Sequence, residues 1–231
     1  MDLDSPVCVA IDSADEQRVN TLARATEPYV GLFKVGLTTF TALGPPVVDR
    51  LSRARPVFLD LKLHDIPQQV ASAVHAAERT GASLLTIHAA GGADMVRAAS
   101  DAAEHVTILA VTVLTSLDEE SLSEVGMTGP VEKAVLHLAE LALGNGAGGL
   151  VCSPLEVAAL RVRFGSRDEG GPLLVVPGIR PGGGVVDDQR RTLSPRGAID
   201  AGADVIVVGR PITGSDDPGA AARAITDEVC S

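Results

Sequence analysis

The sequence predicts an α/β fold built as a single-domain (β/α)8 barrel, the TIM-barrel class, over residues 1–231. Short runs rich in β-branched residues alternate with Ala-rich amphipathic stretches along the whole chain, which is typical of repeated strand–helix units around a parallel sheet. Eight such units fit the length. The hydrophobic content of 45% comes mainly from Ala, Val and Leu, with four Phe, one Tyr and no Trp. Branched side chains of this kind line barrel interiors.

The eight expected strands are short apolar runs separated by enough chain for a helix. In chain order they cover residues 7–12, 29–35, 57–63, 83–88, 107–113, 149–152, 173–176 and 204–208. Helical periodicity follows the strands, most clearly over residues 67–79, 131–143, 154–164 and 218–229. Three of these four helices open with proline, at a position where its missing N–H costs nothing. No linker or shift in composition divides the chain.

Two connections are longer than the others, residues 115–130 after the fifth strand and 177–193 after the seventh. Both follow the carboxyl ends of strands, where barrels build their active sites, and both are rich in Gly, Ser, Asp and Pro. Each is either a mobile lid or an ordinary surface insertion. The functional interpretation is favoured for the second, which combines residues 182–184, all glycine, with Arg180, Gln189, Arg190 and Arg191.

Composition and termini exclude several classes of protein. A formal net charge of −11 without a basic face argues against nucleic-acid and anionic-membrane partners. The three cysteines, Cys8, Cys152 and Cys230, fit neither a disulfide framework nor a zinc site, so a reducing cytoplasm is expected. The N-terminus lacks a basic region followed by an apolar stretch, and no segment has the length of a membrane span. We therefore expect a soluble, unprocessed protein.

The third expected strand carries charged residues inside an apolar run. Side chains alternate faces in a strand, so Phe58, Asp60 and Lys62 share one side, and the apolar residues between them can pack on helices. Asp65 follows just beyond the strand's end. Because charges are costly to bury without a purpose, this pattern favours catalysis. A structural ion-pair network is the alternative.

Other polar residues end neighbouring strands. Asp12 ends the first, Lys34 lies in the apolar second, and His88 ends the fourth, so in a barrel they converge on one mouth. His88 is either a hydrogen-bonding neighbour of the site or a satisfied core histidine, whereas His64 is expected on the helix-facing side. With Asp60, Lys62 and Asp65, Lys34 offers positive and negative groups that can alternate, each stabilising its neighbour's charge.

The eighth strand is followed by Gly209 and Arg210. Barrels commonly bind a substrate phosphate at this place, where glycine lets the backbone approach and arginine gives bidentate hydrogen bonds to phosphate oxygens. The alternative is a barrel turn with a surface salt bridge.

Several motifs together resemble one family. The run Asp60-Leu-Lys62-Leu-His-Asp65-Ile-Pro resembles the signature of the orotidine 5′-phosphate decarboxylases. Lys34 precedes this run, and the downstream matches are residues 175–180, 188–191 and 208–212. The resemblance covers nearly the whole chain, in the expected order and on the expected elements. It implies decarboxylation of orotidine 5′-monophosphate to uridine 5′-monophosphate, the last step of de novo pyrimidine nucleotide biosynthesis, with no cofactor and no metal.

The resemblance also implies residue roles. Lys62 becomes the general acid that protonates C6 of the pyrimidine, and Asp60 sits against the departing carboxylate. Lys34, Asp60, Lys62 and Asp65 form an alternating charged array, in which Asp65 comes from the second subunit of a homodimer. The implied substrate contacts are Asp12 and Lys34 at the ribose, Thr115 and Ser116 at the pyrimidine, Gln189, Gly209 and Arg210 at the phosphate, and Arg180 in the closing loop.

One departure and two rivals accompany the resemblance. Gln69 stands where the family usually has threonine, which leaves a ribose-side contact there in doubt. A sugar-phosphate decarboxylase or aldolase of the same superfamily also uses a D-x-K-x-x-D strand, but with magnesium and typically an acidic residue where this chain has Lys34. A catalytically silent phosphate-ligand binder is the other rival, and the intact charged residues argue against it.

Overall fold

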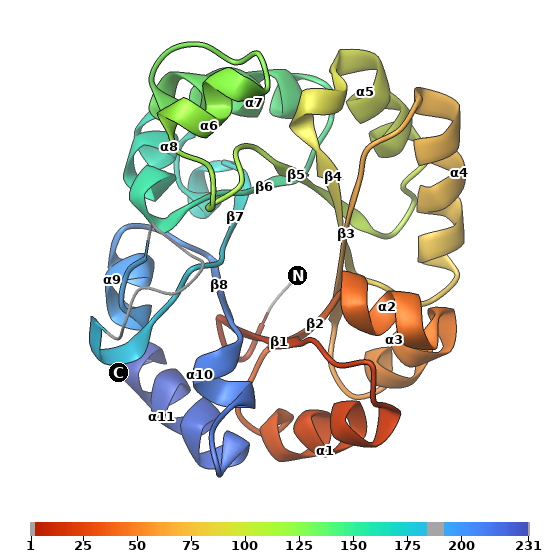
Figure 1. Cartoon of the computed structure of the whole chain (residues 1–231), viewed down its shortest axis with the longest axis vertical. Coiled ribbons are helices and arrows are strands. Elements are labelled where there is room, and N and C mark those ends of the chain that lie inside the picture. Colours follow the sequence, from red (N-terminus) through yellow and green to blue (C-terminus); the bar gives the residue numbers. More distant parts are fainter. Residues whose placement is uncertain (1–2, 184–191, 231) are drawn as a thin grey trace.

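The structure is a computed structural model that describes residues 3–183 and 192–230. Eight parallel strands close into a barrel in sequence order, surrounded by helices (Figure 1). The strands are β1 Val7–Ile11, β2 Leu32–Gly36, β3 Val57–Leu63, β4 Leu84–His88, β5 Thr107–Val111, β6 Gly149–Val151, β7 Leu173–Val176 and β8 Val205–Val208. The predicted (β/α)8 fold is therefore confirmed.

Helices follow each strand on the outside of the barrel (Figure 1). The α-helices are α1 Glu16–Thr26, α2 Leu37–Leu43, α3 Pro45–Ser52, α4 Pro67–Glu78, α5 Ala93–Asp101, α6 Glu119–Glu124, α7 Val131–Gly144, α8 Val157–Phe164, α9 Pro195–Asp200, α10 Arg210–Thr213 and α11 Pro218–Cys230. Short 3₁₀ turns are η1 Ala89–Gly91, η2 Pro154–Glu156, η3 Arg167–Glu169 and η4 Pro181–Gly183. In the described part of the chain, no helix is both long enough and apolar enough to cross a membrane.

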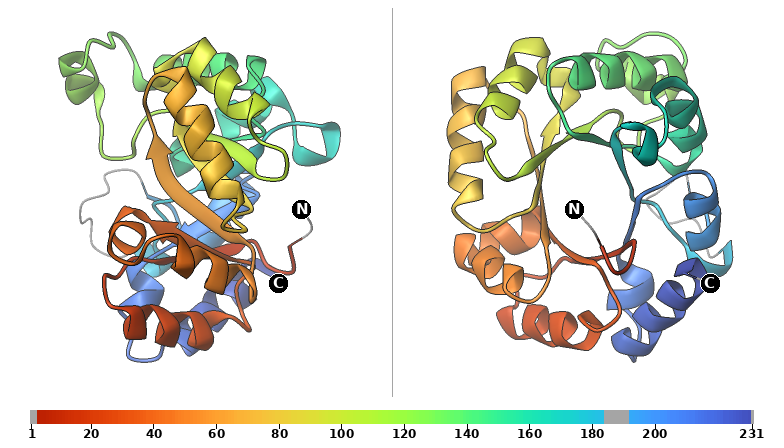
Figure 2. Two further views of the ribbon diagram at one scale, coloured as in Figure 1. Left: turned by 90° about the vertical axis from the view of Figure 1, so that its right-hand side faces the viewer. Right: turned by 180° about the vertical axis from the view of Figure 1, so that it is seen from behind.

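Local chemistry explains where these elements begin and end. Strands β3 and β7 have the predicted bounds, whereas β2 begins at Leu32 because Tyr29 still belongs to the turn that ends α1, where its N–H donates to the Thr26 carbonyl at 3.0 Å. The connection over residues 115–130 contains helix α6, whose N-cap Asp118 accepts the Ser121 N–H at 3.0 Å. Its segment projects from the barrel at the end opposite the N-terminus (Figure 2, left).

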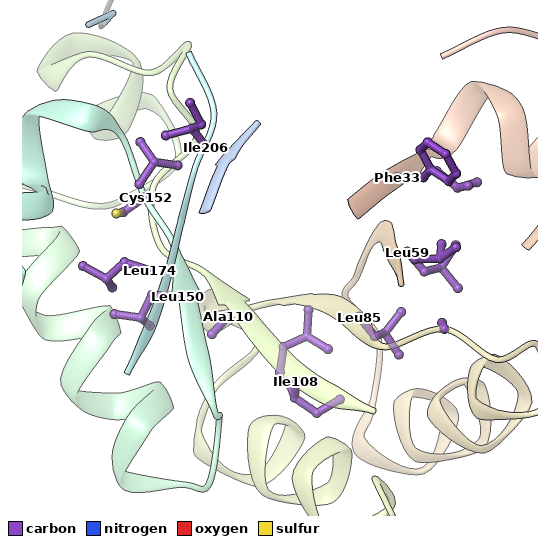
Figure 3. Close-up of a cluster of buried hydrophobic side chains, with 14 of the residues drawn as sticks. Phe33, Leu59, Leu85, Ile108, Ala110, Leu150, Cys152, Leu174 and Ile206 are labelled. Atoms are coloured by element: carbon purple, nitrogen blue, oxygen red, sulfur yellow. The ribbon is translucent and has the colours of Figure 1, made fainter. Parts of the chain in front are cut away.

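Two layers of apolar side chains hold the barrel together. The larger lies between strands and helices, and Figure 3 shows Leu59, Leu85 and Ile108 pointing from successive strands toward the surrounding helices. The smaller fills the barrel and includes Leu32 and Phe58. Each such side chain stabilises the fold by about 1.5–3 kcal/mol on burial. The predicted alternation along the third strand is confirmed, since Phe58 faces inward and Leu59 outward.

Candidate active site

A cavity of about 320 Å3 opens at the carboxyl ends of the strands. Its floor is apolar and includes Ala10, Phe58 and Val207, and its rim is polar. The predicted site residues that line it are Asp12, Lys34, Asp60, Lys62, Thr115, Arg180, Gly209 and Arg210. The barrel thus gathers into one cavity side chains that lie up to 198 residues apart in sequence, from Asp12 to Arg210.

Four of these side chains form an alternating chain of charges. The Lys34 Nζ lies 3.3 Å from the Asp12 Oδ1 and 3.6 Å from the Asp60 Oδ2. The Lys62 Nζ lies 2.7 Å from the Asp60 Oδ1. Each buried charge therefore has an opposite charge beside it, which offsets the cost of removing it from water.

Asp60 is the centre of this charge chain, and its side chain is only 11% exposed. Burial raises the pKa of the Asp60 carboxyl, but the ammonium groups of Lys34 and Lys62 and hydrogen bonds from Lys62 and Thr86 outweigh burial and hold that pKa below its usual value. The carboxylate is consequently ionised at neutral pH, and both lysines stay beside a fixed negative charge.

The backbone at Lys62 departs from a regular strand. Its φ of 50° makes Lys62 the one non-glycine residue in the left-handed region within residues 3–183 and 192–230. The β3–β4 register shifts at the same place, between Leu59 and Leu63, which marks a bulge. Bulges re-aim side chains beside active sites. Here the Lys62 ammonium still reaches the cavity, on the face that strand alternation predicts.

Two neighbours that the sequence analysis did not single out shape the Asp12 end of the site. A Cβ on Gly36 would collide with the Asp12 Oδ1 and come within 2.9 Å of the Lys34 Nζ, so only glycine leaves room for this ion pair. The buried Thr39 hydroxyl accepts the Ser13 N–H at 2.9 Å and lies 2.8 Å from the Ile11 carbonyl, which fixes the backbone on both sides of Asp12. In the sequence, Gly36 could have been singled out because it follows Lys34, a charged residue in an apolar strand, by two positions.

The part of the cavity rim that follows β7 and β8 is formed by Gly209, Arg210 and Arg180. Arg210 is exposed directly after the eighth strand, and Gly209, which has no side chain, precedes it. Arg180 is half-buried: its Nη1 donates to the Ile179 carbonyl at 3.0 Å, and its backbone N–H donates to the Leu193 carbonyl at 2.9 Å. Other predicted loop residues, Gln189, Arg190 and Arg191, lie outside the described residues.

Two predicted site residues do not line the cavity of their own chain. Asp65 is exposed beyond β3, and its Oδ1 accepts the Ile66 N–H at 2.7 Å. Ser116 is exposed beside Thr115, which does line the cavity. Gln69 lies exposed in the first turn of α4. The roles of these residues stay predictions.

The histidines lie beside the charged chain rather than in it. His88 is half-buried at the end of β4, and its ring centroid is 5.5 Å from that of His64. Burial lowers the pKa of His88, and His64 and Lys62 lower it further against the opposing effect of Asp60, so the ring is neutral at neutral pH. His64 is exposed just beyond the end of β3 at Leu63.

The cysteines show no reactive arrangement. All three are free, and burial raises the pKa of the Cys8 thiol far above its usual range, so this thiol stays protonated. Cys152 is buried at the cavity wall. Among the residues the structure describes, no group of three or more His, Cys, Asp or Glu side chains is placed to hold a metal ion.

Fold and site together define a (β/α)8-barrel protein with a charged cavity at the carboxyl ends of its strands, the construction that barrel enzymes share. The chain belongs to the orotidine 5′-phosphate decarboxylase / HUMPS family, whose model matches residues 5–225.

Known proteins agree with this assignment in sequence and in structure. Orotidine 5′-phosphate decarboxylase of Anaeromyxobacter sp. (strain K) is 57% identical over 95% of this chain and 96% of its own. The enzyme of the same name from Thermobifida fusca is 49% identical over 97% of this chain and 96% of its own. The crystal structure of orotidine 5′-phosphate decarboxylase from Lactobacillus acidophilus superposes with a TM-score of 0.86, at 36% identity over 99% of this chain and 100% of that chain.

Proposed function

We propose that this chain decarboxylates orotidine 5′-monophosphate to uridine 5′-monophosphate, with Lys62 as the general acid and without an organic cofactor or a metal. One observation carries the proposal: an ionised Asp60, buried between Lys34 and Lys62, lines a cavity that also holds Gly209 and Arg210. Family membership supports the same reaction.

The chemistry explains why fixed positive charge is needed. Loss of carbon dioxide from C6 leaves an electron pair in the plane of the pyrimidine ring, where the π system cannot delocalise it. The Lys62 ammonium near C6 attracts this developing carbanion more strongly than the ground state, whose negative charge lies farther away. The same ammonium then donates a proton to C6, so that uridine 5′-monophosphate forms and Lys62 becomes a neutral amine until it regains a proton from solvent.

Asp60 fixes the position of Lys62 for this step, and Lys34 contacts Asp60 from the other side. The 2.7 Å contact with Asp60 holds the Lys62 ammonium in place. Asp60 also faces the position where the substrate carboxylate binds, so repulsion between the two negative groups is relieved as carbon dioxide leaves. The Lys34 ammonium keeps Asp60 ionised.

The remaining lining residues are suited to the other parts of the nucleotide. We assign Asp12 and Lys34 to the ribose hydroxyls, Thr115 to the pyrimidine, and Gly209 and Arg210 to the phosphate; all five residues line the cavity. Phosphate binding far from the breaking bond supplies binding energy that can lower the barrier at the reacting centre.

We further propose a homodimer in which Asp65 completes the partner's charged array. Asp65 is exposed outside its own cavity, which leaves its carboxylate available to a second subunit. Mixing Asp65→Asn and Lys62→Ala subunits tests this arrangement, because a hybrid dimer regains one site with both residues intact. Lack of recovered activity despite proven subunit exchange contradicts a shared site.

The magnesium-dependent rival is disfavoured by Lys34. Its ammonium lies against Asp12 and Asp60, where a divalent cation would need those carboxylates, and like charges repel. Activity unchanged by a chelator is the expected result, and a chelator-sensitive rate restored by magnesium favours the rival.

The direct test mixes purified protein with orotidine 5′-monophosphate and follows the loss of its ultraviolet absorbance. Lys62→Ala should abolish turnover, while Lys133→Ala, an exposed lysine on α7, should leave it unchanged. Turnover by Lys62→Ala at the wild-type rate overturns the proposed general acid. Binding without turnover by the wild-type protein overturns the activity.

A further inference from the structure

Thr86 forms hydrogen bonds with both Asp60 and Lys62, the two central residues of the site. It lies in β4 and is fully buried. Its Oγ1 lies 3.0 Å from the Asp60 Oδ1 and accepts the Lys62 backbone N–H at 2.8 Å. The same Asp60 oxygen contacts the Lys62 Nζ at 2.7 Å, so one carboxylate oxygen, one hydroxyl and one lysine form a closed loop of hydrogen bonds.

We propose that Thr86 is a positioning residue for decarboxylation, whose hydroxyl fixes both the Asp60 carboxylate and the Lys62 backbone. The direction of each bond is determined by chemistry. A backbone N–H can only donate and an ionised carboxylate can only accept. The hydroxyl therefore accepts from Lys62 and gives its single proton to Asp60, with no alternative arrangement.

The bulge in β3 explains why a side chain is needed here. Leu59 pairs with Leu85 and Leu63 pairs with Ile87, so residues 60–62 all stand opposite Thr86 alone. Regular strand pairing cannot satisfy the extra backbone groups, and a buried N–H without a partner is costly. The Thr86 hydroxyl takes the place of the missing carbonyl for the Lys62 N–H.

The same bond stabilises an unfavourable backbone conformation. A φ of 50° is strained for lysine and persists only where the surroundings over-determine it. Thr86 holds this conformation from the neighbouring strand, and the conformation in turn directs the Lys62 side chain into the cavity. Loss of the hydroxyl should therefore misplace the Lys62 ammonium, although Thr86 itself does not line the substrate cavity.

The inference rests on the proposed function and predicts a specific pattern of kinetics. Thr86→Val keeps the side-chain shape but removes both hydrogen bonds. We expect kcat to fall about 10- to 100-fold, the effect of losing a hydrogen bond to a charged group. KM should change by less than about threefold, because Thr86 does not line the cavity. The acid limb of the kcat profile should also move to higher pH, because a hydrogen bond that stabilises the Asp60 carboxylate is lost.

Three further variants separate positioning from general damage to the fold. Thr86→Ser keeps the hydroxyl and should retain most of the wild-type kcat, whereas Thr86→Ala, which loses the same methyl group and the hydroxyl as well, should not. Thr26→Val removes an equally buried hydroxyl on α1, which donates to the Leu22 carbonyl at 2.8 Å, and should leave kcat unchanged. If Thr86→Val does not fold, the Ser and Ala pair makes the same comparison.

The outcomes distinguish this inference from the proposed function. Wild-type kcat and an unmoved acid limb in folded Thr86→Val, or equal kcat in Thr86→Ser and Thr86→Ala, overturn the positioning role. Lys62→Ala measured in the same assay tests the general acid separately. Full activity in Lys62→Ala overturns the proposed general acid, and absence of turnover by the wild-type protein overturns the proposed reaction. Inactive Lys62→Ala beside fully active Thr86→Val overturns only the role of Thr86.

Discussion

Replacing Lys34 by methionine removes one positive charge from the buried charge chain while keeping an unbranched side chain of similar length. The Lys34 Nζ lies 3.6 Å from the Asp60 Oδ2, and both side chains are 11% exposed. At an effective dielectric constant of about 20, two unit charges at this distance attract each other by about 4–5 kcal/mol. The contact with Asp12 adds less, because the Asp12 side chain is 50% exposed and screened by water.

The measurable effect is smaller than this attraction, because methionine also avoids the cost of burying an ammonium group. We expect a net loss of about 2–4 kcal/mol in transition-state stabilisation, or roughly 30- to 1000-fold in kcat/KM. The pKa of Asp60 should rise, since Lys34 is the strongest influence that lowers it. The acid limb of the kcat/KM profile should therefore move to higher pH.

The assay measures kcat/KM for orotidine 5′-monophosphate across pH, with Lys133→Met as the matched control. The chain contains three lysines, and Lys133 is the exposed one on α7, so its replacement changes the net charge equally. A folded Lys34→Met protein within about threefold of wild type, with an unmoved acid limb, would refute the reasoning from charge.

Three other substitutions test separate parts of the account. Arg210→Ala should lower kcat/KM by about 1.5–3 kcal/mol, the value of charge-assisted hydrogen bonds to a phosphate, and unchanged kinetics contradict the phosphate contact. Gly36→Ala should raise KM, because the new methyl group collides with the Asp12 Oδ1, and an unaffected KM contradicts the ribose contact. Glu78→Ala should cost about 1–3 kcal/mol of unfolding free energy in urea without changing kcat, because the Glu78 Oε1 accepts three backbone N–H groups of residues 104–106. Burial raises the pKa of Glu78, but these hydrogen bonds outweigh it and lower that pKa. The stability difference is therefore full above the usual value of 4.5 and disappears as pH falls through the lower folded pKa; a pH-independent difference contradicts this explanation.

The sequence predicted what depends on local periodicity. Alternation along residues 57–63 correctly assigned Asp60 and Lys62 to the inner face and Leu59 to the outer one, because side-chain direction in a strand repeats every two residues. The order of strands followed from the repeated units. Parallel strands bring their carboxyl ends to one mouth, so Lys34 met Asp60 as expected.

Features that depend on the register between strands were not predictable. Whether Thr86 faces the bulge in β3 depends on how β3 pairs with β4, and a single sequence contains no direct signal for that shift. Thr39 similarly reaches the Asp12 loop only because α2 follows β2 at that end of the barrel.

A structure of the protein bound to uridine 5′-monophosphate tests the central claim most directly. The account predicts that the Lys62 Nζ lies within about 3.5 Å of C6 of the pyrimidine, close enough to pass a proton. A Lys62 ammonium directed away from C6, with another acidic group in that position, would contradict it.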